Sequence, residues 1–527
     1  MTVVSTFRKS LARNTLGAMS GLLAGYTALA VAELVASLIR PQAGPVTVVG
    51  GAAIDRTPAA VKDFAIRTFG ENDKVVLQLG ILAVLGLLGI VLGIVSLRYR
   101  RAGAAGVLLF GVIGAAAALS RPDTQGIADA LPSVAGALAG AAVLYLLAGK
   151  LNSGSSALGT EATEGGWSRR GFLTAASVTA VAATGAGAVG RALIGRSGQG
   201  ASASRAAVKL PAPASAAAAL PSGVQLKVEG ISAFTTANKD FYRVDTALVV
   251  PKVDADTWRL RIRGKGVTRP RTYTFQELLD RPLIERDITL TCVSNEVGGP
   301  YIGHARWLGV RLDDLLKECG VVPPSRGGKA DQLVARSVDG MTLGSPVEDV
   351  MDGRDAILAV GMNGEPLPFD HGFPVRMLVP GLYGYVSACK WIEEIELTTF
   401  DSYDPYWVKR KWARKAPIKT QARIDTPKPF GRPTGEVVTV AGVAWAQHRG
   451  IERVEVRVDD GPWQDADLAP QANKDTWRQW SFPWKPTPGG HNLTVRATDG
   501  TGQVQTEERK RTIPDGASGW HSVFVTT

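Results

Sequence analysis

The 527-residue sequence has little cysteine, and this scarcity limits the redox cofactors that the chain can hold by itself. Its three cysteines, Cys292, Cys319 and Cys389, form neither a CxxC nor a CxxCH motif. A covalently attached c-type haem, a four-cysteine iron–sulfur site and a disulfide scaffold are therefore excluded. By default each of the three is a small buried apolar residue, because free cysteine is among the most buried residue types.

Histidine is also scarce, and the apolar first third of the chain contains none of the five. Ligation of a b-type haem by two histidines is therefore excluded in that part. The sequence shows no flavin fingerprint and no iron–sulfur motif. We expect no haem, flavin or iron–sulfur cluster in this chain, and therefore a separate membrane or extracytoplasmic electron-transfer partner.

Basic residues are in excess, but no basic block of the kind that binds a nucleic-acid backbone is present. The formal net charge is +11, and much of the excess flanks hydrophobic stretches. This distribution is typical of a membrane protein, with the lipid bilayer rather than nucleic acid as its partner. A chain of this length is too long for one core, so two or three units are expected.

Residues 1–150 contain four apolar segments of the length that crosses a bilayer. A bilayer core of about 30 Å requires an apolar helix of roughly 18–25 residues, and glycine and alanine favour close helix packing. The sequence therefore predicts a four-helix transmembrane segment. It serves either as a plain anchor or as a binding site for a partner, a quinone or a lipid. The segments are Leu16–Ile39, Val75–Leu97, Ala102–Leu119 and Leu131–Gly149.

A fifth apolar segment, within residues 165–195, follows the adjacent arginines Arg169 and Arg170. Two arginines before a mild apolar run are typical of a twin-arginine export signal, and the alternative is the positive flank of an ordinary membrane helix. The run lacks a clear small-residue cleavage site, so it is expected to stay as a fifth membrane helix. Residues 196–223 are rich in Ala, Ser and Pro and are predicted to form a disordered linker.

The basic residues around these segments predict the topology. Placing nine of them inside satisfies the positive-inside rule and sends everything after residue 195 outside. The loop from Arg40 to Lys74 counts against this arrangement, because its five basic and four acidic residues would lie outside. The prediction is a multi-pass protein of a bacterial cell membrane with an extracytoplasmic globular part. The nine are Arg8, Lys9, Arg13, Arg98, Arg100, Arg101, Lys150, Arg169 and Arg170.

From residue 224 the composition is that of a globular protein. Short β-branched stretches alternate with helix candidates over 224–415, which predicts a mixed α+β domain. Over 416–527, short alternating strands separated by Gly, Pro and Asp turns predict an all-β, immunoglobulin-like sandwich. Predicted strands are Trp258–Ile262, Asp287–Leu290, Val437–Val443, Val454–Val458, Trp477–Trp484 and Asn492–Thr498, and predicted helices are Thr274–Leu279 and Leu312–Cys319.

Two stretches of the α+β region carry candidate chemistry. Cys292 ends a strand-like run and opens a loop with two glycines, so its sulfur is placed to face a bound group. Downstream, residues 363–391 combine Gly and Pro turns with His371, Arg376 and Lys390. These donors suit a phosphate-bearing organic cofactor, and together the two stretches predict a cofactor site.

Residues 225–527 resemble the sulfite oxidase family of molybdopterin-dependent oxidoreductases. The motifs HGFPVR (371–376), VPG (379–381) and KW (390–391), with Cys292 upstream, carry the resemblance. It implies an α+β molybdopterin-binding domain followed by a sandwich of the dimerisation type, and hence a homodimer formed through that sandwich. It also implies a molybdenum–molybdopterin cofactor whose metal is held by the pterin dithiolene, oxo groups and one cysteine thiolate.

The resemblance also implies roles for individual residues. Cys292 matches the molybdenum ligand, and Arg243 matches an arginine near the metal that orients the substrate oxygen; both are the expected catalytic residues. His371 and Arg376 match a pair, five residues apart, at the phosphate end of the pterin. A packed histidine is an equal alternative for one of the remaining cofactor-binding candidates, His304. The remaining candidates are Tyr242, Arg243, Asn295, His304, Ala388, Cys389 and Lys390.

Departures from the family pattern bear on the substrate, which is expected to be a small-molecule oxo-donor or oxo-acceptor. Sulfite-oxidising members carry Asn-Arg-Arg after the cysteine, where this chain has Asn295, Glu296 and Val297; a later arginine and an active-site tyrosine are matched by Asp515 and Trp412. Each charge-assisted hydrogen bond to a dianion is worth about 1.5–3 kcal/mol, so these losses disfavour sulfite.

The pattern favours two-electron oxygen-atom transfer from an S-oxide or N-oxide, as in the bacterial methionine-sulfoxide-reductase branch. Two alternatives stay open from the sequence. One is a sulfite dehydrogenase with the same cofactor. The other is a membrane-anchored adhesion or scaffold protein without enzymatic activity.

Overall fold

The computed structural model describes residues 2–58, 61, 64, 68–69, 73–121, 124, 126–152 and 169–527. The chain divides into two compact units. One is helical and comprises Met1–Gly200 with Thr246–Val250, and the other comprises Ala201–Asp245 with Pro251–Thr527.

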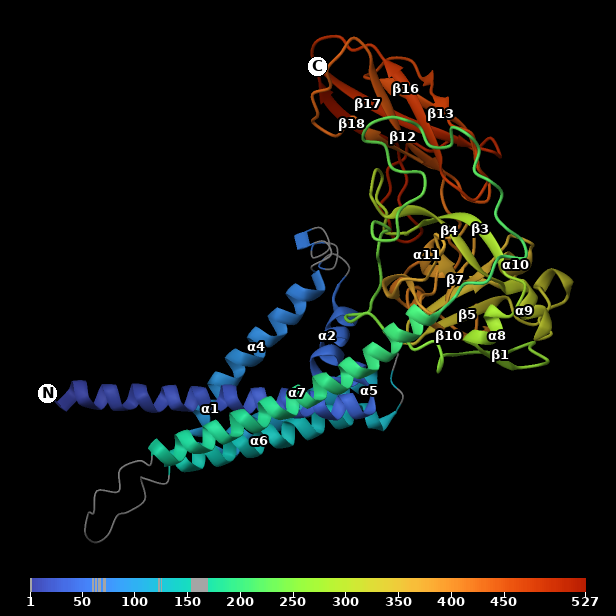
Figure 1. The fold of residues 1–527 in the computed structure, drawn as a ribbon. Helices are drawn as coiled ribbons and strands as arrows, with labels where there is room; N and C mark the ends of the chain where they lie inside the picture. Colours follow the sequence, from blue (N-terminus) through green and yellow to red (C-terminus); the bar gives the residue numbers. More distant parts are fainter. Residues whose placement is uncertain are drawn as a thin grey trace, which may run out of the picture. The chain divides into compact units, whose positions relative to one another are not determined.

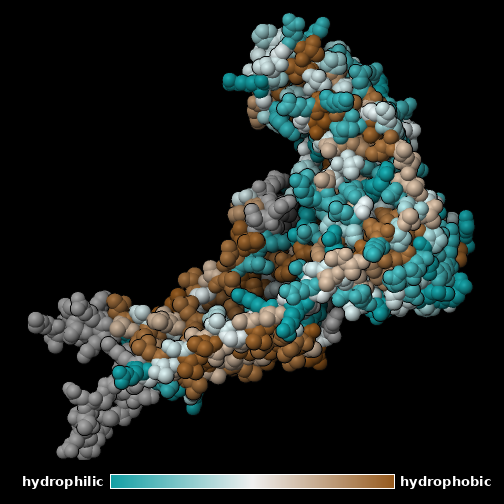
Figure 2. Space-filling model, in the orientation of Figure 1, coloured by the Kyte–Doolittle hydropathy of each residue, from teal (hydrophilic) through white to brown (hydrophobic). Residues whose placement is uncertain are grey.

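The helical unit is built from long apolar helices (Figure 1). Within the described residues, five helices are long and apolar enough to cross a membrane, and they coincide with the five predicted apolar segments. Large hydrophobic side chains cover their outer faces, as Figure 2 shows. A soluble surface rarely exposes so much apolar area. The helices are α1 (Thr2–Ile39), α2 (Pro45–Arg56), α4 (Asp73–Ser96), α5 (Arg100–Ser120), α6 (Leu131–Asn152) and α7 (Arg169–Ala207).

Glycines bring the helices of this unit into close contact. A Cβ atom on Gly93 of α4 would fall 2.1 Å from the backbone oxygen of Gly17 on α1. On α6, a Cβ atom on Gly136 would fall 2.4 Å from the backbone oxygen of Ala28. Larger residues at these positions would force the helices apart, so the small-residue composition explains the tight packing.

Hydrogen bonds of Arg13 connect α1 with the ends of α4 and α6. Its Nη2 atom donates to the oxygen of Leu97, just after α4, at 3.2 Å, and to Oδ1 of Asn152 on α6 at 3.0 Å. At the other end of α1, Arg40 forms a 2.7 Å ion pair with Asp129, whose side chain is 3% exposed. Arg13, inside α1, therefore lies beside the ends of α4 and α6, and the membrane topology stays a prediction.

The segment between α7 and the globular domain corrects the prediction of a disordered linker over 196–223. α7 continues to Ala207, and beyond it the amide of Ala214 donates to the oxygen of Leu283 at 2.8 Å. Ser215 forms a parallel bridge with Ile284. The prediction was wrong because it considered side-chain patterns only. The segment is held by its backbone groups, which pair with the start of β3 and need no core-forming side chains. In the predicted export motif, residues 167 and 168 lie outside the described residues.

The α+β domain contains two five-stranded sheets that share one hydrophobic core (Figure 1). The first has the order β2-β1-β10-β5-β6, in which β1 and β10 are parallel. The second has the order β3-β4-β7-β8, with β9 also paired to β7. The strands are β1 (Arg259–Gly264), β2 (Arg271–Thr274), β3 (Ile284–Thr291), β4 (Ile302–Arg311), β5 (Gln332–Ser337), β6 (Thr342–Pro346), β7 (Ile357–Met362), β8 (Glu365–Pro366), β9 (Arg376–Leu378) and β10 (Ile392–Thr398).

Short helices connect these strands. Both predicted helices of the domain are confirmed as α8 (Phe275–Leu279) and α9 (Leu312–Glu318), and α10 (Val347–Met351) and α11 (Gly384–Ser387) complete the set in this fully described region. The hydroxyl of Thr274 and the carboxylate of Glu277 form a capping box that starts α8. The predicted strands at Trp258 and Asp287 are confirmed as β1 and β3.

Residues 416–527, all of which the structure describes, form two four-stranded sheets around a second core. The sheets have the orders β11-β12-β16-β15 and β14-β13-β17-β18, and both contribute apolar residues to that core. The four predicted strands are confirmed as β12, β13, β16 and β17; the immunoglobulin-like assignment stays a prediction. The bounds are β11 (Gln421–Thr426), β12 (Val438–Trp445), β13 (Ile451–Val458), β14 (Gln464–Asp465), β15 (Asp467–Leu468), β16 (Arg478–Trp484), β17 (Gly490–Asp499) and β18 (His521–Thr526).

The sandwich holds the end of β3 and the loop that follows it. Gln447 donates to Oγ1 of Thr291 at 2.8 Å, and Arg423 donates to the oxygen of Gly299 at 2.7 Å. The His521 ring from β18 lies directly against Gly298, whose φ is +79°; a Cβ atom there would fall 2.2 Å from the ring. Only glycine fits this contact, which fixes the loop against the sandwich.

Stability of the sandwich is expected to fall in acid because of His521. Its Nδ1 accepts a 3.0 Å hydrogen bond from the Ile424 amide, and burial, followed by the charge of Arg423, lowers its pKa to about 4. Between the unfolded pKa of about 6.5 and this value the unfolded chain binds more protons, so stability falls as pH falls. Between pH 7 and pH 4.5 the unfolding free energy of the parent chain should fall by about 2 kcal/mol more than that of the His521→Gln variant. Tryptophan-monitored denaturation measures both.

His491 provides a control of opposite sign. Its hydrogen bond to Asp459 raises its pKa, so the stability that it contributes is present in acid and is lost as pH rises. The His491→Gln variant should therefore be weaker at pH 4.5 and unchanged near pH 8. An acid response of His521→Gln identical to that of the parent chain would contradict the role of His521.

Candidate active site

Cys292 lies immediately after β3, in a short loop that closes on itself. Its amide donates to the oxygen of Tyr301 at 3.0 Å, and its oxygen accepts from the Asn295 amide at 3.0 Å. Oδ1 of the buried Asn295 accepts from the Tyr301 amide at 2.8 Å. Asn295, predicted as a cofactor-binding residue, therefore holds the two sides of the cysteine loop together and fixes the direction of the sulfur.

The Cys292 thiol is 9% exposed and lies among polar groups. Burial raises its pKa, while hydrogen bonds from Ser294 and the positive charge of Lys390 oppose this shift. Burial also raises the pKa of Tyr242 and of Tyr383, and the charge of a Cys292 thiolate adds to both shifts. The phenols of Tyr242 and Tyr383 are therefore both neutral and close enough to Cys292 to respond to its charge.

His371 and Arg376 come together across a tight turn. Gly372 has a φ of +109°, and a Cβ atom there would fall 3.1 Å from both Arg376 and Lys390. The Nε2 atom of His371 lies 2.9 Å from the oxygen of Asn238 and donates to it, and burial lowers the pKa of His371 to about 4. The ring is therefore neutral at physiological pH, with its tautomer fixed by that hydrogen bond.

Arg376 is 5% exposed and has few partners for a buried cation. One Nη1 atom donates to the oxygen of His371 at 3.2 Å, and the guanidinium lies 5.1 Å from the centre of the Trp307 ring. Burial lowers its pKa to about 10, so it remains charged at neutral pH. Among the residues that the structure describes, its Nε atom has no hydrogen-bond partner.

Lys390 and Arg243 share a carboxylate. The Nζ atom of Lys390 and the Nε atom of Arg243 each donate to Oδ2 of Asp245 at 2.8 Å, and Arg243 also pairs with Asp370 at 3.1 Å. Burial lowers the pKa of Lys390 to about 8, although Asp245 opposes the shift. Both predicted cations are thus neutralised by acidic residues that the sequence motifs did not indicate.

A second ion pair, Lys419–Asp515, lies next to Tyr383. Lys419 Nζ donates to Oδ1 of Asp515 at 2.9 Å, and the Lys419 amide lies 3.4 Å from the Tyr383 hydroxyl. Trp412, which occupies the position of a family tyrosine, packs its ring 5.3 Å from that of Tyr385. Two of the residues that depart from the family pattern, Trp412 and Asp515, therefore lie in one region, where the Ala413 amide donates to the oxygen of Pro514.

His304, Cys389 and Ala388 are buried or half-buried, and their role in cofactor binding stays a prediction. His304 is fully buried, its ring lies 4.6 Å from that of Phe234, and its nitrogens face Thr289 at 3.3 Å and Asp287 at 3.6 Å. These contacts are those of the packed-histidine alternative. Cys389 is 1% exposed and its oxygen accepts from the Met377 amide. Ala388, beside it, is half-buried.

Comparison with known proteins agrees with this arrangement. Residues 247–407 match the family described as the oxidoreductase molybdopterin binding domain. The mitochondrial sulfite oxidase of Homo sapiens is 29% identical over 341 residues, which cover 55% of this chain and 62% of the human protein. Sulfite oxidase of Gallus gallus is 31% identical over 320 residues, which cover 52% of this chain and 68% of the relative. This chain belongs to the sulfite oxidase family of molybdenum-dependent oxidoreductases.

This family is one of molybdenum-dependent oxidoreductases, which disfavours the scaffold alternative. The chain spans 62% of the length of the human, macaque and mouse sulfite oxidases that it matches. Among solved structures, sulfane dehydrogenase SoxCD from Paracoccus pantotrophus is similar at 24% identity and a TM-score of 0.49, covering 56% of this chain and 82% of that one.

The side chains of the site fit the family's molybdopterin cofactor. Cys292 offers a sulfur donor, Gly372 lets Arg376 and Lys390 approach each other closely, and Arg376 offers a buried donor atom without a protein acceptor. Within the described residues, no three His, Cys, Asp or Glu side chains gather as a metal site. A metal held by Cys292 would therefore take its other ligands from the organic cofactor, as a soft thiolate site allows.

Proposed function

We propose that this chain reduces a neutral S-oxide or N-oxide by two-electron oxygen-atom transfer. The observation that carries the proposal is the neutralisation of the cations around Cys292. Lys390 and Arg243 are paired with Asp245, and Lys419 is paired with Asp515. Binding of an anion such as sulfite would require these pairs to open, whereas a neutral oxide accepts hydrogen bonds without displacing a carboxylate.

Each residue of the site has a proposed role. Cys292 holds the metal, and His371 and Arg376 hold the phosphate end of the pterin, with Arg376 as the charged donor. Bound molybdenum supplies the two-electron oxygen transfer. The Tyr242 phenol, neutral because burial raises its pKa, donates a hydrogen bond to the substrate oxygen. Arg243, held by Asp245 and Asp370, is the second proposed catalytic residue.

The proposed cellular setting follows from the helical unit. Its five apolar helices span a bacterial cell membrane, with Arg13 and the ends of α4 and α6 on the cytoplasmic side. The catalytic domain then lies on the extracytoplasmic side, where a twin-arginine signal would deliver it. Electrons come from a separate partner at the membrane, and two chains associate through their sandwich domains.

Sulfite dehydrogenation is the second candidate, because the relatives of this chain are named sulfite oxidases. A substrate panel separates the two. With purified full-length protein, we expect reduction of methionine sulfoxide and of an N-oxide by a dye donor, and little sulfite oxidation by a dye acceptor. Sulfite oxidation with a higher kcat/KM than either reduction would overturn the proposal.

Asp515→Arg is expected to change this preference. It replaces the carboxylate beside Lys419 by a cation, so at least one charge-assisted hydrogen bond to an anion becomes available. The kcat/KM for sulfite should rise by about 10- to 100-fold, because such a bond is worth about 1.5–3 kcal/mol. The kcat/KM for methionine sulfoxide should change little, and Asp460→Arg on the exposed surface of the sandwich is the matched control.

A further inference from the structure

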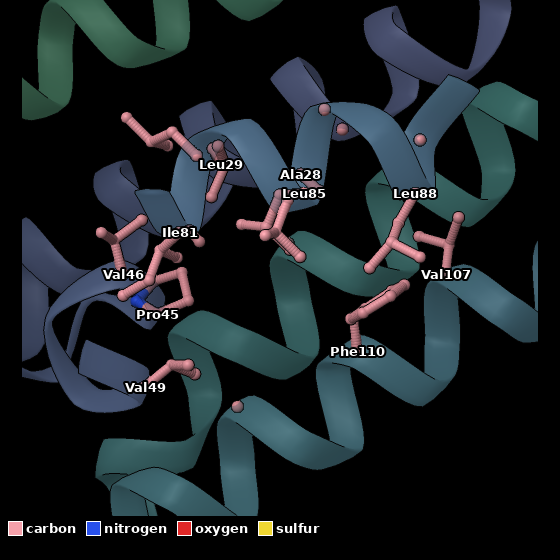
Figure 3. Close-up of a pocket in the computed structure, with 18 of the residues that line it drawn as sticks. Ala28, Leu29, Pro45, Val46, Val49, Ile81, Leu85, Leu88, Val107 and Phe110 are labelled. Carbon is pink, nitrogen blue, oxygen red and sulfur yellow. The ribbon is translucent and has the colours of Figure 1, made fainter. Parts of the chain in front are cut away.

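The helical unit contains a partly open apolar cavity of about 800 Å³ among α1, α2, α4, α5 and α6. This volume is within the range of about 300–1,000 Å³ that small-molecule sites have. Figure 3 shows Ile81, Leu85 and Leu88 of α4 on its wall with Val107 and Phe110 of α5. The described residues that line it all belong to the helical unit.

The chemistry of the lining is selective. It contains no Asp, Glu, Lys or Arg, and its only hydroxyl groups are those of Tyr26 and Ser133. The Tyr26 hydroxyl already bonds Oγ1 of Thr184 at 3.0 Å. Ser133 is 4% exposed, and within the described residues its Oγ has no hydrogen-bond partner. A buried hydroxyl without a partner is unfavourable, so the cavity suits a ligand that offers one acceptor to Ser133.

The shape of the cavity indicates a long apolar ligand. The lining residues of α4 run from Val76 to Leu92, which corresponds to about 24 Å along a helix. Ser133 lies near one end of the cavity, in the first turn of α6, close to Pro45 and to the buried pair Arg40–Asp129. The described lining residues carry no charge that would pair with a phospholipid headgroup, and the nearby Arg40 is already paired with Asp129.

We propose that this cavity binds an isoprenoid quinone, with a ring carbonyl accepting a hydrogen bond from Ser133 and the tail lying along α4. The part of this inference in which the quinol donates electrons rests on the proposed reductase function. Oxidation of a quinol releases two electrons and two protons. Reduction of one S-oxide to a sulfide and water consumes the same number of each. In the proposed topology, Ser133 lies at the extracytoplasmic end of the bundle.

Binding of the ring is tested with a menaquinone that has a geranylgeranyl tail, titrated into detergent-solubilised full-length protein. Ser133→Ala should weaken binding by about three- to tenfold, the effect of one neutral hydrogen bond. Ser20→Ala should leave the Kd unchanged, because the hydroxyl of this buried helix serine already donates to Leu16. Geranylgeraniol, which has the same tail without the quinone ring, should bind much more weakly than the quinone.

Occupancy of the cavity is tested by filling it. Gly25 lines the cavity, and a Cβ atom there would meet nothing within 4 Å, so Gly25→Phe adds a ring to the cavity without a backbone clash. It should weaken quinone binding by more than about tenfold, since the ring occupies space that the ligand needs. The matched control is Gly185→Phe on α7, equally free of contacts and outside the cavity lining.

Two results would overturn the inference: a Kd unaffected by Ser133→Ala and Gly25→Phe, or equal binding of quinone and geranylgeraniol, which would indicate a general lipid site. The titration needs no turnover and is repeated on Cys292→Ser. Unchanged quinone binding together with sulfite oxidation as the preferred reaction would refute the proposed reductase function and leave this site in place. If the protein did not bind quinone but still reduced sulfoxide with a dye, the quinone site would be refuted and the proposed reductase function would remain.

Discussion

Replacing Cys292 with serine is expected to abolish oxygen-atom transfer while leaving the fold intact. A serine hydroxyl does not ionise near neutral pH and is a harder donor than sulfur, so it is a poor ligand for a metal that takes thiolate. Loss of a residue that merely supports a ligand costs about 10- to 100-fold, so loss of the ligand itself should cost more than about 100-fold in kcat. The checks are turnover, molybdenum content and the thiolate-to-molybdenum absorption band, which should disappear.

Cys319→Ser is the matched control for this experiment. Cys319 is also fully buried, but its sulfur lies 3.6 Å from the Tyr273 hydroxyl at the end of α9, away from the cysteine loop. The same substitution there should leave the absorption band and the turnover unchanged. If Cys292→Ser kept both as well, Cys292 would not be the metal ligand.

The sequence predicted the site because its main residues belong to short motifs. Cys292 follows a strand of eight residues, and His371 and Arg376 lie five residues apart on one turn, so local spacing places them. The neutralising carboxylates could not be found in this way. Asp245 pairs with a lysine 145 residues later, and Asp515 pairs with one 96 residues earlier. Such partners are set by the fold, and no periodicity records them.

In the fold, too, elements set by local sequence patterns were predicted, whereas contacts between distant segments were not. Alternating strands and apolar helices follow from side-chain periodicity, and the long apolar helices, α8, α9 and six of the strands were predicted from it. The segment after α7 was misjudged because its bonds, such as that from Ala214 to Leu283, use backbone atoms that every sequence supplies. Helix α2 was also missed; it begins at Pro45, within a stretch that was considered only for its charge.

Replacing Arg376 with methionine is expected to remove the cofactor without weakening the protein itself. The guanidinium is buried with no carboxylate near it in the described site, which is costly unless an anion is bound. Two charge-assisted hydrogen bonds to a phosphate would contribute about 3–6 kcal/mol, or about a 10²- to 10⁴-fold effect on cofactor affinity. We therefore expect Arg376→Met to purify with little molybdenum or pterin, and its cofactor-free unfolding free energy to stay equal to the parent or to rise.

Two further variants separate this role from a structural one. Arg376→Lys keeps the charge but not the planar fork, so its cofactor content should be intermediate. Arg449→Met removes an arginine bonded at 2.8 Å to the fully buried Asp499, which leaves that carboxylate without its cation. Its unfolding free energy should fall by about 3–5 kcal/mol, with cofactor affinity retained. A full cofactor load in Arg376→Met would show that the phosphate end of the pterin binds elsewhere, because no other buried arginine of the described site lacks a protein acceptor for its Nε atom.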